Sequence, residues 1–442
     1  MEAKNKSFAM ISLGCAKNLV NSEQMLYLMS EAGFTLVPDP DGADLVIVNT
    51  CGFIDAAKSE AIDNILEMAE LKKAGKLGGI IVTGCLSERY KDTILSELPE
   101  IDAVLGISNF KDIVFAANAV MERRACSLFS DQSAPVDEIP RVVTTGPGWA
   151  YLRIAEGCNN FCAFCAIPLI RGRYRSRKME NILEEAKDLA AHGIKELIVI
   201  AQDITRYGTD LYGHRCLVEL CRKLSEIEGI EWIRLHYLYP DQFDDELIDE
   251  IAGNEKIVKY LDIPIQHINN GILKKMNRRG TGDDIRALFA TLRARIPGLV
   301  LRTSLIAGLP GEGETEFEEL CAFLKEARIE RAGVFPFSPE EGTPAAGMPC
   351  VPPEEAQRRA DLIMELQAPI MDDFTQSFVG KTIRVLCEGR DEESGLLVGR
   401  SYADSPEIDG SVQFEGFCPP GEFAKVRITS AEDGVLYGEE AT

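Results

Sequence analysis

The residues with the most specific chemistry are Cys158, Cys162 and Cys165, which form a C-x3-C-x2-C motif. Three thiolates on one loop can bind three irons of a [4Fe–4S] cluster. The next cysteine along the chain is Cys216, so the fourth iron is left open for a reacting ligand. A zinc loop or buried free thiols are the alternatives, but zinc usually closes its site with a fourth Cys or His at short spacing. We therefore predict a catalytic iron–sulfur cluster on this loop.

Three further cysteines share one context, because each lies just past the end of an expected parallel strand. Cys15 ends Met10-Ile-Ser-Leu-Gly-Cys, Cys51 ends Leu45-Val-Ile-Val-Asn-Thr-Cys, and Cys85 ends Ile80-Ile-Val-Thr-Gly-Cys. Carboxyl ends of neighbouring strands converge on one crevice in open α/β sheets. Buried cysteines that behave as small hydrophobes are the alternative, which fits one cysteine better than three in equivalent places. The pattern predicts a second [4Fe–4S] cluster with one open iron.

The elements that position the second set of cysteines form the first part of the chain. Apolar runs at 8–13, 44–48 and 79–82 alternate with helical stretches at 22–32 and 56–71, which predicts a βαβαβ unit with a parallel sheet. We expect an N-terminal domain over residues 5–127. A linker rich in Pro, Gly, Ser and Thr should follow at 128–148.

A second α/β series follows the linker. Six strand candidates separated by helical stretches predict an open (β/α)6 partial TIM barrel over residues 149–375. From 376 to 442 the pattern changes to short runs divided by turn residues, which predicts a small C-terminal β-barrel of OB-like size. The barrel strands are expected at 151–155, 196–201, 232–238, 260–265, 301–307 and 333–337, and the tail strands at 382–386, 395–400, 410–414, 422–428 and 435–438.

Charge and cysteine usage restrict the partners and the compartment. The chain has 442 residues, a formal charge of −24 and 13 cysteines. No apolar run is long enough for a membrane helix and no export signal is visible, so we expect a cytoplasmic protein in which clustered cysteines bind metal. From residue 375 onward six basic residues stand against 13 acidic ones, a net −7, which favours a basic protein partner over phosphates. Asp404, Glu407 and Asp409 are expected to be exposed contacts in this tail.

The C-x3-C-x2-C loop after a first barrel strand resembles that of the radical S-adenosylmethionine (radical SAM) enzymes. With the N-terminal domain and the β-barrel tail, the whole chain resembles the methylthiotransferases, in which the tail is a TRAM domain. Within that family it is most similar to the RimO branch, which modifies an aspartate of small-subunit ribosomal protein S twelve. The stretches that carry the resemblance are Ser12-Leu-Gly-Cys-Ala-Lys-Asn-Leu-Val, Asn49-Thr-Cys-Gly-Phe-Ile-Asp, Cys165-Ala-Ile-Pro-Leu-Ile-Arg-Gly-Arg-Tyr-Arg-Ser-Arg, Leu261-Asp-Ile-Pro-Ile-Gln-His and Gly399-Arg-Ser-Tyr-Ala-Asp-Ser-Pro-Glu-Ile-Asp-Gly.

The resemblance implies two [4Fe–4S] clusters, SAM bound to the open iron of the first, and an electron donor of flavodoxin or ferredoxin type. It implies that Phe164, the aromatic residue before the last cysteine of the motif, lies beside the adenosyl group. Gln202 and Asp203 end the second barrel strand, where SAM contacts are expected. Gly308 lies in a Gly-Leu-Pro-Gly-Glu-Gly turn that is expected to border the same pocket.

Two alternatives for function and two for a charged segment remain open. The same chemistry could act on an adenosine of tRNA, although that branch typically has Gln-Met-Asn after the first cysteine, where this chain has Ala16-Lys17-Asn18. A non-catalytic iron–sulfur carrier is the second alternative, which SAM binding would exclude.

The basic cluster just past the iron loop is either a solvated helix start or a patch that steers an anionic group; it comprises Arg171, Arg173, Arg175, Arg177 and Lys178.

Overall fold

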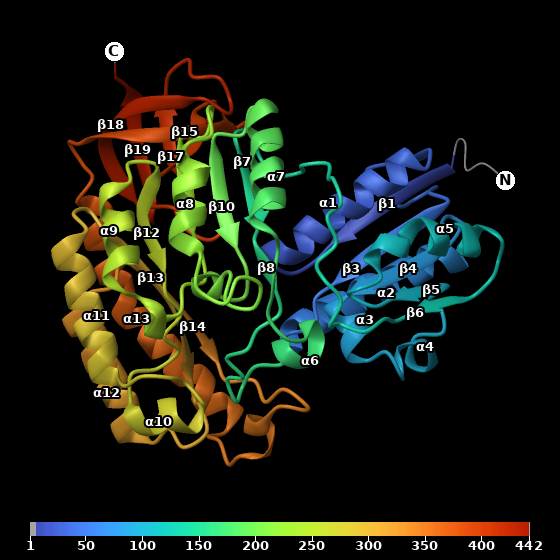
Figure 1. Ribbon diagram of the computed structural model, residues 1–442, viewed down its shortest axis with the longest axis horizontal. Helices are drawn as coiled ribbons and strands as arrows, with labels where there is room; N and C mark the ends of the chain where they lie inside the picture. Colours follow the sequence, from blue (N-terminus) through green and yellow to red (C-terminus); the bar gives the residue numbers. More distant parts are fainter. Residues whose placement is uncertain (1–5, 442) are drawn as a thin grey trace. The chain divides into compact units, whose positions relative to one another are not determined.

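The computed structural model describes residues 6–441, and the chain divides into two compact units (Figure 1). The first unit contains the chain up to Thr144, the segment Ala155–Arg177 and the segment Ser338–Ala346. The second unit contains Thr145–Ile154, Lys178–Phe337 and the chain from Gly347 onward. The loop with the C-x3-C-x2-C motif therefore belongs to the same compact unit as Cys15, Cys51 and Cys85.

The first unit is built on a six-stranded parallel sheet in the order β2-β1-β3-β4-β5-β6. All six residues of its central strand β3 are buried, as expected of a parallel strand covered on both faces. A short antiparallel pair, β8 with β9, accompanies the sheet. The strands are β1 (Lys6–Ser12), β2 (Phe34–Leu36), β3 (Leu45–Thr50), β4 (Ile80–Gly84), β5 (Ala103–Leu105), β6 (Cys126–Leu128), β8 (Ala155–Glu156) and β9 (Arg175–Ser176).

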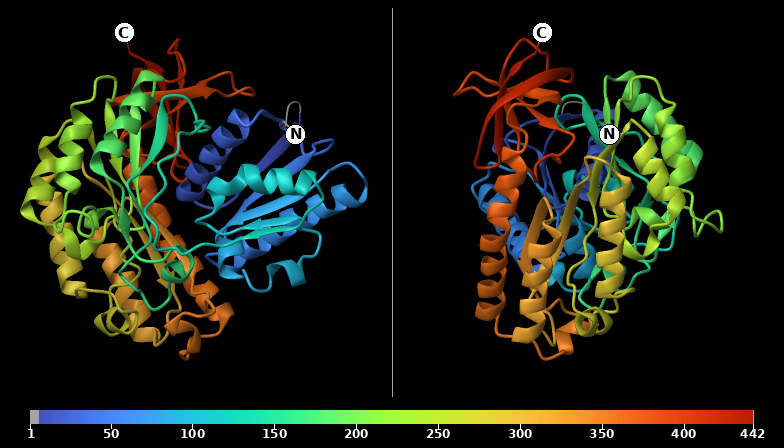
Figure 2. Two further views of the ribbon diagram at one scale, coloured as in Figure 1. Left: turned by 45° about the vertical axis from the view of Figure 1, so that its right-hand side comes forward. Right: turned by 90° about the vertical axis from the view of Figure 1, so that its left-hand side faces the viewer.

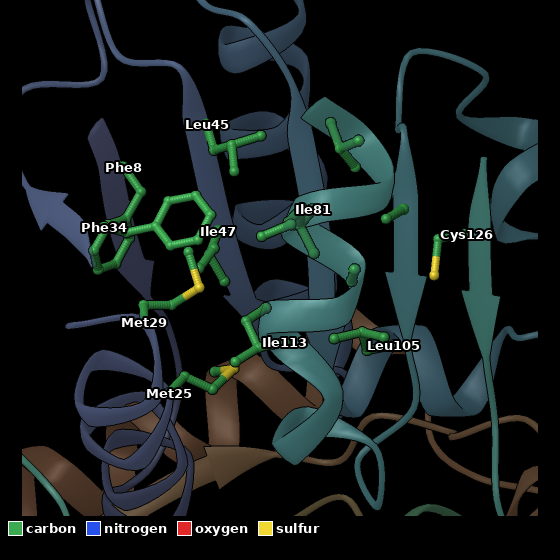
Figure 3. Close-up of a cluster of buried hydrophobic side chains, with 14 of the residues drawn as sticks. Phe8, Met25, Met29, Phe34, Leu45, Ile47, Ile81, Leu105, Ile113 and Cys126 are labelled. Carbon is green, nitrogen blue, oxygen red and sulfur yellow. The ribbon is translucent and has the colours of Figure 1, made fainter. Parts of the chain in front are cut away.

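Alternate residues of β3 pack into two separate cores. Leu45 and Ile47 join Phe8, Met25 and Ile113 on the face covered by α1 and α5, which Figure 3 shows in close-up. Val46 and Val48 pack on the opposite face with side chains of α2. The alternation follows from the two-residue period of a strand and fixes the register of the sheet. The helices of this unit are α1 (Ala16–Glu31), α2 (Asp55–Lys73), α3 (Cys85–Arg89), α4 (Ile94–Glu97), η1 (Phe110–Asp112), α5 (Ile113–Met121) and α6 (Ile167–Arg171).

The second unit contains another six-stranded parallel sheet, in the order β14-β13-β12-β11-β10-β7. Its strands follow one another in chain order from one edge to the other, as the repeated βα units predict. The expectation of six parallel strands in this part of the chain is confirmed. The strands are β7 (Trp149–Arg153), β10 (Glu196–Ile200), β11 (Trp232–Leu235), β12 (Ile257–Asp262), β13 (Val300–Ala307) and β14 (Arg331–Pro336).

Amphipathic helices connect these strands and bury one stripe each. In α8 the buried residues include Leu217, Leu220 and Leu224, at helical spacing. The long helix α13 packs against β13 and β14 and leads toward the tail (Figure 2). No helix in the described part of the chain combines the length and apolarity needed to cross a membrane. The helices are α7 (Met179–Ala191), η2 (Ile204–Arg206), α8 (Leu217–Ser225), η3 (Pro240–Gln242), α9 (Asp245–Gly253), α10 (Asn270–Lys275), α11 (Gly282–Arg295), α12 (Glu314–Ala327), η4 (Pro344–Gly347) and α13 (Pro353–Gln376).

The tail forms a closed barrel in the order β15-β16-β17-β19-β18, which confirms the expected five-stranded fold. Closure removes the exposed edges that an open five-stranded sheet would present. The strands are β15 (Thr382–Arg390), β16 (Leu397–Ser401), β17 (Val412–Glu415), β18 (Phe423–Glu432) and β19 (Val435–Glu440).

The loop after β16 corrects one expectation about the tail. Asp404 is buried, not exposed: its carboxylate accepts hydrogen bonds from Arg331 Nη2 at 2.7 Å and from Ser401 Oγ at 2.6 Å. Asp409 is half-buried and accepts from the hydroxyl of Tyr260 at 2.6 Å. Of the three acidic residues only Glu407 is exposed. Because Arg331 and Tyr260 lie on strands of the parallel sheet, this loop joins the tail to that sheet and is not a free contact surface.

Candidate iron–sulfur and cofactor site

Three adjacent strands of the first unit place Cys15, Cys51 and Cys85 at one edge of the sheet. Cys15 follows β1 at the start of α1, Cys51 follows β3, and Cys85 follows β4 as the first residue of α3. Since β1, β3 and β4 are parallel neighbours, their carboxyl ends lie side by side, as the strand pattern predicts. Cys85 is buried and the other two are partly buried.

The turns that hold these cysteines pack closely against one another. Gly14 has a φ of +93°, and a Cβ at this position would lie 2.8 Å from Cys51 Cβ and 3.2 Å from Cys51 Sγ. A Cβ on Gly52 would lie 2.8 Å from the backbone of Leu86. Any side chain at Gly14 would therefore occupy the space beside the Cys51 sulfur, which has to remain open if that sulfur binds a metal.

The three thiols differ in their readiness to ionise. Burial raises the pKa of Cys51 to about 11, and the neighbouring sulfurs Cys85 and Cys15 add to that shift. Burial also raises the pKa of Cys85, although the charge of Arg171 opposes it. Burial works against ionisation of Cys15 too, but the charges of Lys17 and Arg171 with backbone hydrogen bonds outweigh it and lower the pKa. The close packing of the three turns brings these cysteines together, and a metal bound there would hold them as thiolates.

A buried polar network adjoins Cys85. Arg171 donates from Nη1 to both carboxylate oxygens of Glu156, at 2.9 and 2.8 Å. Its Nη2 donates to Asn18 Oδ1 at 2.5 Å and lies 3.6 Å from Cys85 Sγ. Asn18 Nδ2 donates to the carbonyls of Leu13 and Thr50, which fixes the orientation of its amide. A positively charged donor beside a sulfur, such as Arg171 beside Cys85, stabilises the anionic form of that sulfur.

The loop with Cys158, Cys162 and Cys165 is closed at its base by the β8–β9 pair and by the bond from Cys158 N to Gly172 O at 3.2 Å. Within the loop, Asn160 N donates to Cys158 Sγ at 3.5 Å, and Cys165 N donates to Cys162 O at 3.0 Å. Cys162 is buried, whereas Cys158 and Cys165 are partly buried. Three cysteines on one closed loop, with a backbone N–H aimed at one sulfur, fit the donor set of an iron–sulfur cluster. Phe164 is half-buried on this loop.

The basic cluster after this loop is not a uniformly solvated surface. Arg171 is 1 % exposed, and Arg177, also buried, pairs with Glu138 through Nε at 3.1 Å. Arg173 and Lys178 are exposed. Neither the solvated helix start nor the steering patch describes the buried pair. The sequence of the basic cluster does not show that Arg171 and Arg177 are buried, because the carboxylates that pair with them lie outside the cluster.

Of the expected SAM contacts, Gln202 has the environment that best fits a polar ligand. It follows β10, and both its side-chain Nε2 and Oε1 are buried without a hydrogen-bond partner among the described residues. A buried amide whose two polar atoms make no hydrogen bond lowers the stability of the fold, unless a ligand forms those hydrogen bonds. The neighbouring Asp203 is fully buried, and its carboxylate accepts from Thr205 N and Arg206 Nε, both at 3.0 Å. Its oxygens therefore shape the turn after β10.

Gly308 lies in the turn after β13, where packing and conformation both require glycine. Its φ is +82°, and a Cβ there would lie 2.5 Å from Ala356 Cβ. Its N–H donates to Glu312 Oε1 at 2.9 Å, and Glu312 also lies 3.3 Å from Nε2 of the buried His267. The turn joins β13 to α12 and packs on α13. Its contact with SAM stays a prediction.

Comparison with known proteins adds to this geometry. Residues 7–106 match a family described as the uncharacterized protein family UPF0004, residues 152–324 match the radical SAM superfamily, and residues 379–440 match the TRAM domain. The chain is 48% identical to the ribosomal protein uS12 methylthiotransferase RimO of Acetivibrio thermocellus, with 98% of each chain covered. It belongs to the RimO family of methylthiotransferases.

The RimO protein of Caldanaerobacter subterraneus is similarly close, at 49% identity over 98% of this chain and 100% of that protein. Among solved structures, the radical SAM methyltransferase TsrM of Kitasatospora setae aligns with a TM-score of 0.56 at 16% identity, covering 77% of each chain, which shows the fold alone. Membership in the radical SAM superfamily implies a [4Fe–4S] cluster and SAM. The chain joins this domain to a TRAM domain.

Proposed function

We propose that this protein attaches a methylthio group to the β-carbon of an aspartate in ribosomal protein uS12, the S twelve protein of the small subunit. The observation that carries the proposal is the pairing of two cysteine triplets in one compact unit of a RimO-family chain. The name of the RimO relatives supports the substrate. The segment Ala16-Lys17-Asn18, where the tRNA-modifying branch typically has Gln-Met-Asn, agrees with it.

The reaction needs two kinds of iron site. An aspartate β-carbon carries an unactivated C–H bond that no side-chain base removes at neutral pH, so hydrogen abstraction has to come from a radical. A [4Fe–4S] cluster with SAM supplies that radical when bound, and a second cluster with an open iron supplies a place for sulfur. We assign the first to Cys158, Cys162 and Cys165.

We assign the second cluster to Cys15, Cys51 and Cys85. The chain's own contribution there is to hold three sulfurs on rigid strand ends and to keep a donor against one of them, as Arg171 does. Gln202 offers an amide that can donate to and accept from SAM. We propose Phe164, Asp203 and Gly308 as further SAM-binding residues, each from its place in the sequence pattern of the family.

The proposed partners follow from the reaction and from charge. Reductive cleavage of SAM needs one electron, for which we propose a donor of flavodoxin or ferredoxin type. A substrate on the small ribosomal subunit implies work in the cytoplasm. Exposed acidic side chains on the tail barrel suit a basic ribosomal protein better than RNA phosphates; they are Glu392, Glu393, Glu407, Glu415, Glu422, Glu432, Asp433, Glu439 and Glu440.

Removing each cysteine triplet tests the two-cluster assignment. Anaerobically reconstituted protein should hold about eight irons per chain, four for each cluster. Cys158, Cys162 and Cys165 replaced together by Ala should halve the iron and abolish reductive SAM cleavage. Cys15, Cys51 and Cys85 replaced together should also halve the iron but leave some SAM cleavage, measured as 5′-deoxyadenosine. Full iron in either variant would show that the ligands are assigned wrongly.

A further inference from the structure

Arg171 links the two cysteine sites within the first unit. It follows Cys165 on the same segment, pairs with Glu156 just before the first cysteine of the loop, and reaches Cys85 of the other triplet. Its side chain is 1 % exposed and Glu156 is buried as well. An arginine buried so completely needs its partners, and here one of those partners is a sulfur.

The contact with Cys85 gains importance once the sulfur is anionic. As a thiol, Cys85 donates to Asn18 Oδ1 at 3.6 Å. A thiolate has no proton to donate, so the fixed amide oxygen of Asn18 would then face a negative sulfur. Arg171 Nη2 lies within hydrogen-bond distance of both Asn18 Oδ1 and Cys85 Sγ. It places a positive charge and an N–H donor between the amide oxygen and the anionic sulfur.

The surroundings of Cys85 strengthen that contact. Ile107, Ala166 and Ile170 form a buried apolar cluster with Cys85. Water is kept from the pair, so the guanidinium charge acts on the sulfur in a medium of low dielectric constant. Glu156 moderates the charge, because its carboxylate binds the other side of the same guanidinium.

We propose that Arg171 is a positioning residue that sets the reduction potential and the stability of the cluster held by Cys15, Cys51 and Cys85, with Glu156 as its opposing partner. The inference rests on the proposed function, which provides that cluster. Hydrogen bonds and nearby charge at cluster sulfurs tune the reduction potential. A cation next to a ligand sulfur favours the more negative, reduced cluster and so raises the potential, whereas an anion lowers it.

The test uses the full chain with Cys158, Cys162 and Cys165 replaced by Ala, so that only the second cluster is measured. In this background Arg171→Met should lower the midpoint potential found by EPR-monitored titration, and Glu156→Gln should raise it. Arg171→Met should also weaken iron binding, measured in competition with a chelator, by about tenfold to a hundredfold, the usual effect on metal affinity of losing such an outer contact. Arg177→Met removes another buried arginine that pairs with a carboxylate and serves as the matched control; its potential should not move.

The double variant Arg171→Met with Glu156→Gln covers the case in which a lone buried Glu156 prevents folding. Its net charge is unchanged but the N–H donor is lost, so its potential should still lie below that of the unaltered background. Potentials that shift in the same direction for Arg171→Met and Glu156→Gln, or that do not shift, would overturn the inference and leave a structural role. Failure of the proposed function is distinct, because it would appear as absence of the second cluster from the unaltered protein or as unmodified uS12.

Discussion

At the scale of residues, Gly14 offers a direct test of the sulfur site. Gly14→Ala should place a methyl group 2.8 Å from Cys51 Cβ and lower the iron content by the share of one cluster. Gly33→Ala is the matched control, because Gly33 has a φ of +86° with no atom within 4 Å of the added Cβ. The control should cost about 1 kcal/mol of unfolding free energy through backbone strain, with iron unchanged.

Iron content and urea unfolding of both glycine variants separate the two effects. If Gly14→Ala kept all its iron while losing the same stability as Gly33→Ala, the space beside the Cys51 sulfur would not be needed for a ligand.

The sequence reveals the cysteines of the site but not their polar neighbours. Cys15, Cys51 and Cys85 could be grouped in advance because parallel strands carry their ends to one edge. The burial of Arg171 could not, since it depends on Glu156 and Asn18, which pair with it only in the folded chain. Gln202 could be expected near SAM from its place at a strand end, whereas its unsatisfied amide is visible only in the structure.

At the scale of elements, a buried ionic network joins the tail barrel to the parallel sheet. Glu196 at the start of β10 accepts from Arg234 Nε and from Arg400 Nη2, both at 2.7 Å. Arg400 also donates to Glu388, at 2.6 Å. All but Glu388 are fully or almost fully buried. The network explains why the loop after β16 is held against the sheet and unavailable to a partner.

This network should make the protein sensitive to acid. Burial opposes ionisation of Glu196, but Arg400 and Arg234 outweigh it and hold the pKa below its usual value of about 4.5. The stabilisation is therefore fully present above about pH 4.5 and is lost as the pH falls toward the lower folded pKa. Glu196→Gln should cost about 3–5 kcal/mol at pH 7, because two buried arginines lose their anion, and should flatten the acid dependence.

Urea unfolding of the parent protein and of Glu196→Gln, at neutral pH and below pH 4.5, measures both the loss of stability and the change in its acid dependence. An acid dependence identical in Glu196→Gln and the parent would contradict this account of the network.

Element prediction succeeded where the pattern was long and failed where it was short. The six strands of the second unit and the five of the tail lie at or close to their expected positions, because each is an apolar run bounded by turn residues. The strands β2, β5 and β6 were missed; each has three residues, too few for a period to show. Asp404 was expected to be exposed because a loop between strands usually is, and Arg331 overrides that tendency.

At the scale of the whole molecule, the exposed acidic residues of the tail barrel are the surface expected to bind uS12. Replacing the exposed Glu392, Glu393 and Glu432 by Lys should slow association with uS12, and the effect should shrink at high salt. Both clusters should stay intact. By contrast, Asp404→Lys should destabilise the protein through loss of the Arg331 contact.

Association rates at low salt and near 1 M salt provide the measurement, since the Debye length falls from about 10 Å at 0.1 M to about 3 Å at 1 M. Unchanged association by the triple Lys variant, together with tight, salt-sensitive tRNA binding by the parent protein, would favour the tRNA substrate over uS12.

Methylthiolation of uS12 by this protein can be measured by mass spectrometry of uS12 from cells with and without the gene. We predict a mass gain equal to exchange of one H for SCH3, confined to a single aspartate and present only when the gene is intact. Cells whose gene carries Ala at Cys15, Cys51 and Cys85 should lack the modification. An identical uS12 mass in cells with and without the gene, with a methylthio group on tRNA adenosine that depends on it, would contradict this prediction.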